Sequence, residues 1–274
     1  DFIYSGSTEG GSDTSLVTKL MINLGDGVFT EGEHPLPSMN HATFRWFNWD
    51  NDGYPDLFSA GRGGIRVEDE HHYYGIWLVN DGAGNLEDMD FTSNSCWFAS
   101  SSVADVNNDG LTDLCISGKT LYKDNYGSYY SGKAWVMTNN FQYYYDPALE
   151  YGTFSNYKGI FSSFCDFDED SDVEVFISGS LNDTPESNIY YYSQYGMYIR
   201  ENDTNLPGVY DGGTGWCDFD MDGDEDVLIT GYIDADSTCT SSLLRNDNGS
   251  FTELTTIILP VAQSTVVWGD VDCD

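Results

Sequence analysis

Basic residues are scarce in this chain of 274 residues, because 10 Lys and Arg stand against 46 Asp and Glu and the formal net charge is −36. Such a chain repels the phosphates of nucleic acids and the headgroups of anionic membranes, so we expect neither as a partner. Long apolar runs are also missing, since none approaches the ~18 residues of a membrane-spanning helix. We therefore expect no direct membrane insertion of this segment.

Residues for acid–base or nucleophilic catalysis are few. The four histidines stand in no motif, and the sequence contains no phosphate-binding glycine loop, nucleophile elbow, or Ser-His-Asp or His-Cys arrangement. Carboxylates are plentiful, but metal binding explains their pattern, as described below. One segment with two histidines, residues 68–72, could bind a transition metal, although a solvated loop explains it more simply. We therefore expect a protein that is not an enzyme.

The six cysteines fit no zinc motif, because no two of them have the C-x₂-C spacing. They are Cys96, Cys115, Cys165, Cys217, Cys239 and Cys273. Cys165 and Cys217 precede two similar acidic loops, so each fits a small buried strand residue. Cys96 with Cys115, or Cys239 with another cysteine, would be candidate disulfides in a secreted chain, but the sequence does not determine the pairing.

One acidic stretch, residues 217–231, shows the chemistry most clearly. Carboxylates stand at Asp218, Asp220, Asp222 and Asp226, and Gly223 permits a sharp reversal of the backbone. Alternate spacing on a tight loop turns several oxygens inward, and hard oxygen ligands without histidine favour Ca²⁺ over zinc or a redox metal. The β-branched and apolar residues that follow are typical of a buried strand.

The EF-hand is the obvious alternative for such a run of aspartates. Its loop needs a bidentate Glu at the twelfth position and a helix on each side. In this chain the twelfth position is Ile229, which lies inside the expected strand. The sequence therefore predicts a calcium loop between two β-strands instead.

The same loop recurs along the chain. Its copies begin at 48, 105, 166, 218 and 270, so that successive copies start 57, 61, 52 and 52 residues apart. Four copies are complete, at 48–56, 105–113, 166–174 and 218–226, while the fifth is split between 270–274 and Asp1. A period of roughly 50 residues in a β-rich chain predicts propeller blades or a similar array.

Four strands are expected in each repeat. A short strand rich in small residues precedes each loop, at 42–46, 99–103, 161–164, 213–216 and 264–268, and all of these except 99–103 contain an aromatic residue. A second strand follows the loop, and a hairpin supplies the other two. We predict an all-β fold: a single β-propeller domain over residues 1–274, with five repeats of four-stranded antiparallel blades. The calcium loop would join the first two strands of each blade.

Two aromatic runs lie within the hairpins. In the third repeat the hairpin is expected to turn at Asn139-Asn140 into a strand at 141–145. The fourth repeat, with strands at 189–192 and 196–200, is the least regular. The tyrosines at 143–145 and 190–192 could stack on sugars, but packing within the sheets explains them more simply.

The loop pattern D-x-D-x-D-G-x-x-D-[LV], with a hairpin such as Leu244–Thr252, resembles the FG-GAP/VCBS repeat family, to which the integrin α-chain propeller belongs. The resemblance covers essentially the whole chain. It implies a calcium-binding β-propeller, usually extracellular, that acts in adhesion or as a scaffold. The ring would have five blades, or the chain would be part of a ring of six to eight.

The resemblance also implies a set of calcium ligands, taken over position by position. The side-chain ligands would be Asn48, Asp50, Asp52, Asp56, Asp105, Asn107, Asp109, Asp113, Asp166, Asp168, Asp170, Glu174, Asp218, Asp220, Asp222, Asp226, Asp270, Asp272, Asp274 and Asp1. Backbone carbonyls would come from Tyr54, Leu111, Asp172 and Asp224. Ser171 departs from the pattern because it stands where glycine is usual. The split fifth site requires the two ends to meet or further residues to complete it.

The functional hypothesis is a calcium-rigidified, non-enzymatic module at the cell surface or secreted, structural or adhesive within a surface or filamentous assembly. Its partners would be other protein modules or copies of itself. The alternative is a carbohydrate-binding or accessory domain of a larger secreted enzyme, with glycans as partners. Sequons at Asn182, Asn202 and Asn248 predict a glycoprotein. Because both ends cut the loop motif, we expect an excerpt or a mature fragment of a longer chain.

Overall fold

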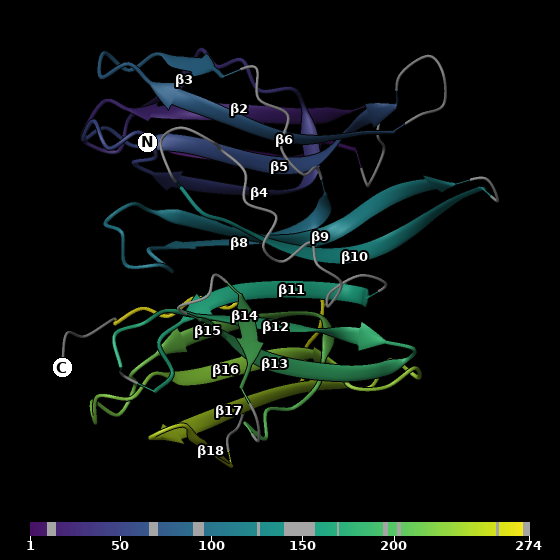
Figure 1. Cartoon of the computed structure of the whole chain (residues 1–274). Helices are drawn as coiled ribbons and strands as arrows, with labels where there is room; N and C mark the ends of the chain where they lie inside the picture. The colour runs from purple at the N-terminus through teal and green to yellow at the C-terminus, as the bar shows by residue number, and fades with distance from the viewer. Residues whose placement is uncertain are drawn as a thin grey trace. The chain divides into compact units, whose positions relative to one another are not determined.

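The computed structural model describes residues 1–9, 15–65, 71–89, 96–124, 127–139, 157–168, 170–193, 197–201, 204–255 and 258–270, with the backbone alone at 64–65, 71–74 and 121–130. In these residues all regular structure is β-strand, arranged in four antiparallel sheets (Figure 1). They include no helix of the length and apolarity that crossing a membrane requires. The prediction of an all-β fold is confirmed.

Two compact units make up the chain. The first unit contains residues 1–101 and 118–130, and the second contains residues 102–117 and 131–274. The sequence-based prediction of one propeller domain over residues 1–274 stays a prediction, as does the number of blades in a ring.

The first unit contains two sheets whose strand order follows the sequence. One sheet has three strands, β1 (Phe2–Ser7), β2 (Leu16–Asn23) and β3 (Phe29–Gly32). The other has four, β4 (Met39–Phe47), β5 (Asp56–Ile65), β6 (His71–Asn80) and β7 (Leu86–Asp88). Buried Met39, Leu57 and Leu78 form a core against which Ile3 of the three-stranded sheet packs. Burying such side chains stabilises the fold by roughly 1.5–3 kcal/mol each.

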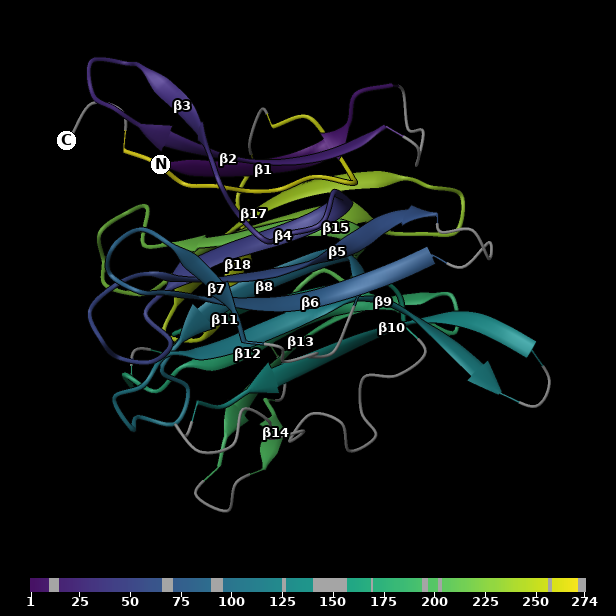
Figure 2. The ribbon, with the colours of Figure 1, turned by 90° about the horizontal axis from the view of Figure 1, so that it is seen from above.

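A seven-stranded sheet follows in the chain. It contains β8 (Trp97–Ala104), β9 (Asp113–Asp124), β10 (Gly127–Met137), β11 (Tyr157–Cys165), β12 (Glu174–Leu181), β13 (Thr184–Tyr192) and β14 (Tyr198–Arg200). The long β9–β10 hairpin is visible in Figure 2. Strands β10 and β11 meet at the pair Gly132 and Tyr157, so this sheet is two repeats joined at one edge.

The fourth sheet belongs to the second unit and again has four strands in sequence order. They are β15 (Tyr210–Cys217), β16 (Asp226–Tyr232), β17 (Cys239–Asp247) and β18 (Ser250–Glu253). Phe161, Phe176 and Ile189 of the preceding sheet form one buried cluster with Val227 and Ile229 of this sheet. The predicted repeat of a strand, an acidic loop, a second strand and a hairpin is therefore confirmed in the described part of the chain.

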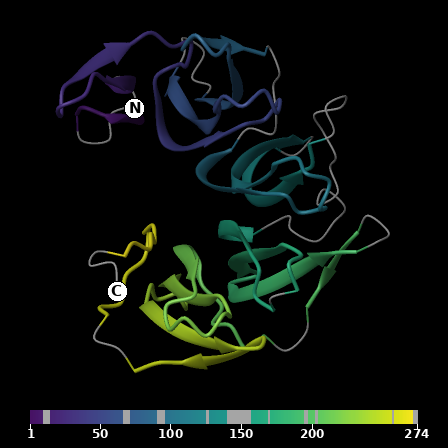
Figure 3. The ribbon, with the colours of Figure 1, turned by 90° about the vertical axis from the view of Figure 1, so that its left-hand side faces the viewer.

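One predicted strand is wrong. Residues 264–268 form no strand in the described segment 258–270, where the isolated bridge between Val261 and Thr240 is the only ladder pairing. A strand requires a ladder of backbone bonds to a neighbour. This segment lies beside the sheet β15–β18 (Figure 3), where the Gln263 amide donates to the Asp211 carbonyl of β15 at 2.6 Å, but no ladder continues from that bond through 264–268. A Cβ on Gly213 would lie 2.6 Å from the Ser264 carbonyl oxygen, so the small residues of β15 allow this approach. The predicted strand at 141–145 lies outside the described residues.

Candidate metal sites

Four acidic loops join the first and second strands of successive repeats, at β4–β5, β8–β9, β11–β12 and β15–β16. The loops at 48–56, 105–113 and 218–226 share the left-handed conformation at the fourth and sixth positions. The fourth-position φ values are 59° at Asn51, 56° at Asn108 and 58° at Met221, and the sixth-position values are 94° at Gly53, 85° at Gly110 and 111° at Gly223. Glycine adopts such angles without steric penalty, so the repeated Asp-Gly pair is explained by the turn.

Ser171 adopts the same conformation as those glycines, with φ of 70°. The departure from the family pattern therefore leaves the local turn intact. A left-handed residue that carries a Cβ is strained by about 1–2 kcal/mol, so the third loop is held by its surroundings against this cost.

Hydrogen bonds from backbone amides within each loop orient the side-chain oxygens of the loop. In the last complete loop, the Asp222 amide donates to Asp218 Oδ1 at 3.2 Å and the Asp224 amide donates to Asp222 Oδ1 at 3.2 Å. The first and second loops repeat the former bond, from Asp52 to Asn48 and from Asp109 to Asp105, each at 3.1 Å. The first and fifth positions of these loops are thus oriented by the backbone itself.

Among the described residues, the ninth-position side chain is the most buried carboxylate of each loop. The exposed fractions are 2% for Asp56, 0% for Asp113, 2% for Glu174 and 0% for Asp226. Asp226 Oδ2 accepts the Phe219 amide at 3.0 Å, and its Oδ1 accepts the Asn246 amide at 2.8 Å. The carboxylate therefore ties the loop to the third strand of its own sheet, in addition to any metal it binds.

The sequence analysis missed the asparagine whose backbone amide donates to the ninth-position carboxylate. The backbone amide of Asn80 donates to Asp56 Oδ1 at 2.9 Å, and the backbone amide of Asn139 donates to Asp113 Oδ1 at 2.6 Å. An available signal was the asparagine that ends the third strand of most repeats. Asn23 is such a residue, and its amide donates to Asp1 Oδ1 at 2.7 Å. Asp1 thus has the hydrogen bond of a ninth-position residue.

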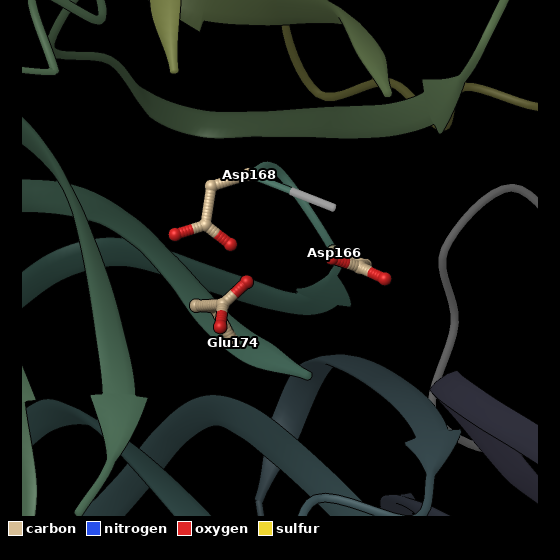
Figure 4. A group of neighbouring side chains, drawn as sticks. All are labelled: Asp166, Asp168 and Glu174. Carbon is tan, nitrogen blue, oxygen red and sulfur yellow. The ribbon is translucent and has the colours of Figure 1, made fainter. Parts of the chain in front are cut away.

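Two loops bring three carboxylates together. Ligand oxygens of Asp166, Asp168 and Glu174 lie within 4.8 Å of one another, as do those of Asp218, Asp220 and Asp226. Figure 4 shows Asp168 and Glu174 turned toward each other, with Asp166 further along the loop. Among the described residues, these are the groups of acidic, cysteine or histidine side chains close enough to hold a metal. The loops at 48–56 and 105–113 do not bring three carboxylates this close.

Burial and mutual repulsion act against the charged forms in these loops. Burial, followed by repulsion from the charge of Asp168, raises the pKa of Glu174 to about 8. Burial also raises the pKa of Asp113 to about 7 and shifts that of Asp226 upward. A cation among the oxygens would offset both effects, so the arrangement fits a hard divalent metal with oxygen ligands.

The third loop opens into a hollow that sequence reasoning also missed. Glu201 and Tyr191 line it together with Asp168, Asp170 and Glu174. Glu201 follows β14 in the least regular repeat, where the sequence offers no positional signal for it. Its carboxylate is a further oxygen donor beside this loop.

Hydrogen bonds link the three loops of the second unit. Asn108 Nδ2 donates to Asp172 Oδ1 at 2.5 Å, which connects the second loop to the third. The Asp166 amide donates to Glu225 Oε2 at 2.9 Å, and Asn246 Nδ2 donates to the Phe167 carbonyl at 2.5 Å. The third loop is therefore bonded to the loops on both sides of it.

The remaining predicted sites have mixed outcomes. Asp272, Asp274 and Asn202 lie outside the described residues, and Asp270 is exposed in the second unit. Asn182 and Asn248 are exposed in tight turns, as a glycosylation site requires. The side chain of Asp224 accepts the Asn248 amide at 2.6 Å. Metal binding by the backbone carbonyls of Tyr54, Leu111, Asp172 and Asp224 stays a prediction.

Three further interpretations concern cysteine, tyrosine and histidine. Cys165 is buried in β11 and Cys217 half-buried in β15, as expected of strand residues. Within the described residues, neither Cys115 nor Cys239 is in a disulfide and Cys96 is buried, while Cys273 lies outside them. Tyr190 is in the buried core of its sheet, which fits packing. The tyrosines at 143–145 and the histidine side chains of segment 68–72 lie outside the described part.

Comparison with known proteins gives one family match. Residues 48–116 match the model of the FG-GAP-like repeat. No curated protein matches the chain. Among solved structures, an Agrocybe aegerita lectin studied for its recognition of non-reducing terminal N-acetylglucosamine is 12% identical, with 86% of this chain and 73% of that chain covered and a TM-score of 0.36. That likeness is too weak to support an argument. Residues 48–116, which include the first two acidic loops, are similar to the FG-GAP-like repeat, so the resemblance drawn from the sequence is confirmed over these residues.

Proposed function

We propose that this chain is a calcium-binding β-propeller, extracellular and non-enzymatic, that acts as a structural or adhesive protein-interaction module. The observation that carries the proposal is the convergence of Asp166, Asp168 and Glu174, and of Asp218, Asp220 and Asp226, within 4.8 Å at equivalent loops. The FG-GAP-like repeat at 48–116 supports it.

Calcium would act by neutralising carboxylates that otherwise repel one another. The ninth-position carboxylate already bonds the loop to the hairpin, so an ion at the same oxygens would fix loop, second strand and third strand together. Binding to the folded form alone stabilises a protein by mass action. The rigid surface that results, rather than any chemistry at the ion, would serve a protein partner.

Ring closure is a second part of the proposal. The sheet β1–β3 has three strands where the sheet β4–β7 has four, and it lacks the strand that would precede a loop. Residues 264–268 have the composition of that strand, so in a five-bladed ring they would pair with β1. Amide exchange tests this: the β1 amides that do not bond to β2 should be protected, and deletion of 258–274 should abolish their protection. Unchanged exchange of β1 after the deletion would indicate a larger ring or none.

Calcium itself is tested by thermal unfolding with and without a chelator, together with elemental analysis of the dialysed protein. We expect four or five calcium ions per chain by this proposal and a large fall in melting temperature on chelation. A protein that holds no calcium and melts at the same temperature with EGTA would refute the metal sites. The acidic loops would then be turns stabilised by hydrogen bonds alone.

A further inference from the structure

A left-handed residue recurs at the opposite end of the first strands from the acidic loops. It stands seven residues before the first loop position, with φ of 47° at His41, 51° at Phe98, 59° at Gly159, 47° at Asp211 and 51° at Gln263. In three sheets a β-bulge accompanies it. The conformation is thus part of the architecture, while the side chain at this position varies from repeat to repeat.

In the first unit this position is aromatic in both repeats, and the rings gather. The His41 and Phe98 ring centroids are 4.0 Å apart, and the Trp97 ring lies 4.7 Å from that of Phe98. Arg62 Cζ lies 5.0 Å from the Trp97 centroid, and Lys119 Nζ lies 4.8 Å from the Phe98 centroid. We call His41, Arg62, Trp97, Phe98 and Lys119 the aromatic–cationic cluster.

Exposure separates this cluster from the core. Phe98 keeps 43% of its surface exposed, and His41 is exposed as well. By contrast, Phe58 and Trp77 of the same unit are buried, with exposed fractions of 0% and 2%. Two exposed rings held on a left-handed backbone beside two cations therefore form a surface that a ligand can reach.

Charge narrows the class of ligand. Only 10 basic residues occur in a chain of net charge −36, and two of them belong to this cluster. Ammonium and guanidinium groups donate charge-assisted hydrogen bonds to a carboxylate. A partner with many acidic groups would be repelled by the rest of the molecule, whereas a single carboxylate on a neutral body meets mainly the local cations.

The rings supply the other half of the recognition. The C–H groups of a sugar pack against aromatic surface, and an exposed phenyl ring next to cations suits a pyranose that carries an acid. We infer that the aromatic–cationic cluster binds a saccharide bearing one carboxylate, such as a uronic acid or a sialic acid. This names a ligand for the module proposed above and rests on that proposal for its role, but it needs neither calcium nor a closed ring.

Calorimetric titration of the whole chain in calcium tests the inference. The probes are methyl glucuronide and sialyllactose, with methyl glucoside and lactose as neutral counterparts. We expect one acidic sugar to bind at least about tenfold more tightly than its neutral counterpart, which is the effect of one charge-assisted contact. The two acidic probes distinguish a uronic acid from a sialic acid.

Variants locate the binding. Arg62→Met and Lys119→Met should each weaken binding of the acidic sugar at least about tenfold and leave the neutral sugar unaffected. Phe98→Asn keeps a residue that tolerates the left-handed backbone and removes the ring, so it should weaken both. The matched control is Lys158→Met, because Lys158 Nζ lies 4.9 Å from the Tyr210 centroid in the second unit, and it should bind as the parent does.

Each contrary result is distinct. Any of three results would overturn the inference. The acidic sugars do not bind at millimolar concentration, acidic and neutral sugars bind equally, or Arg62→Met keeps both the affinity and the melting temperature of the parent. Preferential binding of a polyglutamate peptide would assign the cluster to a protein partner instead. Calcium content measured on the same samples separates the two proposals, since the sugar result and the metal result can fail independently.

Discussion

The third and fourth acidic loops, 166–174 and 218–226, both have a left-handed residue at the sixth position, but they differ in chemistry. The fourth has Gly223 and Asp226, and Asp226 is tied by amides at 3.0 and 2.8 Å. The third has Ser171 and Glu174, and its bond from the Phe167 amide to Glu174 Oε2 is longer, at 3.4 Å. The comparison shows that the fold of the loop tolerates a change of residue at the sixth and ninth positions of a candidate metal site.

The largest effect is expected from removing the ninth-position carboxylate of the fourth loop. Asp226→Ala leaves the buried amides of Phe219 and Asn246 without their acceptor, which costs about 1–3 kcal/mol for each amide. Guanidinium unfolding in EGTA would measure this without any contribution from metal. Asp222→Ala is the control, because Asp222 is exposed and supports one turn. Equal losses in the two variants would contradict the assigned tie.

The third loop is best tested by the pH dependence of the stability of the metal-free protein. The pKa of Glu174 is raised from 4.5 to about 8 by burial, so the folded state holds its proton more tightly than the unfolded state. Its stabilising effect is present below pH 4.5 and is lost as the pH rises toward 8, at most about 1.4 kcal/mol per pH unit.

Glu174→Gln should therefore flatten the loss of stability between pH 4.5 and about 8 in EGTA. The measurement is the denaturation midpoint as a function of pH for the parent and the variant. With calcium present the slope should reverse, because the ion binds the deprotonated form. Parallel pH profiles for parent and variant in EGTA would show that Glu174 is not the group responsible.

A smaller effect should follow from making the two loops alike. Ser171→Gly relieves a left-handed residue with φ of 70°, at the expense of greater backbone entropy in the unfolded chain. The expected net gain is about 1 kcal/mol or less. Ser171→Ala keeps the Cβ and should bring no gain. A stabilised alanine variant would mean that the hydroxyl, and not the conformation, is unfavourable there.

The smallest effect is expected at the link between the second and third loops. Asn108→Gly keeps the left-handed angle of 56° and removes the amide that bonds Asp172. Because this bond is exposed, the loss of stability should stay below about 1.5 kcal/mol. Calorimetric calcium titration should show weaker binding at the third loop, while the fourth keeps its affinity. An equal loss at both loops would indicate a global effect instead.

Local features were predictable from the sequence. The Asp-Gly turns, the strands that follow them and the hairpins depend on neighbours in the chain, and their conformations agree with the repeat pattern. The tie between Asp226 and Asn246 joins residues 20 positions apart, and only the strand register reveals it. Glu201 and the aromatic–cationic cluster were missed for the same reason, since tertiary packing brings their members together.

The segment 264–268 is the opposite case, in which the sequence predicted a strand that the structure does not have. Its composition matches the strands that precede the other loops, and composition alone predicted a strand. A strand exists only where another backbone bonds to it, and Thr230 Oγ1 bonds Ser264 Oγ at 2.7 Å through side chains instead. Pairing is a property of two segments, and the pattern of one segment does not contain it.

The hydrogen bonds between loops connect the three acidic loops of the second unit into a linear series, in which each loop influences the loops next to it. Disorder in the loop 218–226 would pass to the loop 166–174 through Glu225 and Asn246. Disorder in the loop 166–174 would pass in both directions, because Asn108 bonds Asp172 as well. In such a nearest-neighbour system the central member limits the length over which order extends. The loop 166–174, which contains Ser171 and has a bond of 3.4 Å to its ninth-position carboxylate, therefore determines how far local disorder spreads along the series.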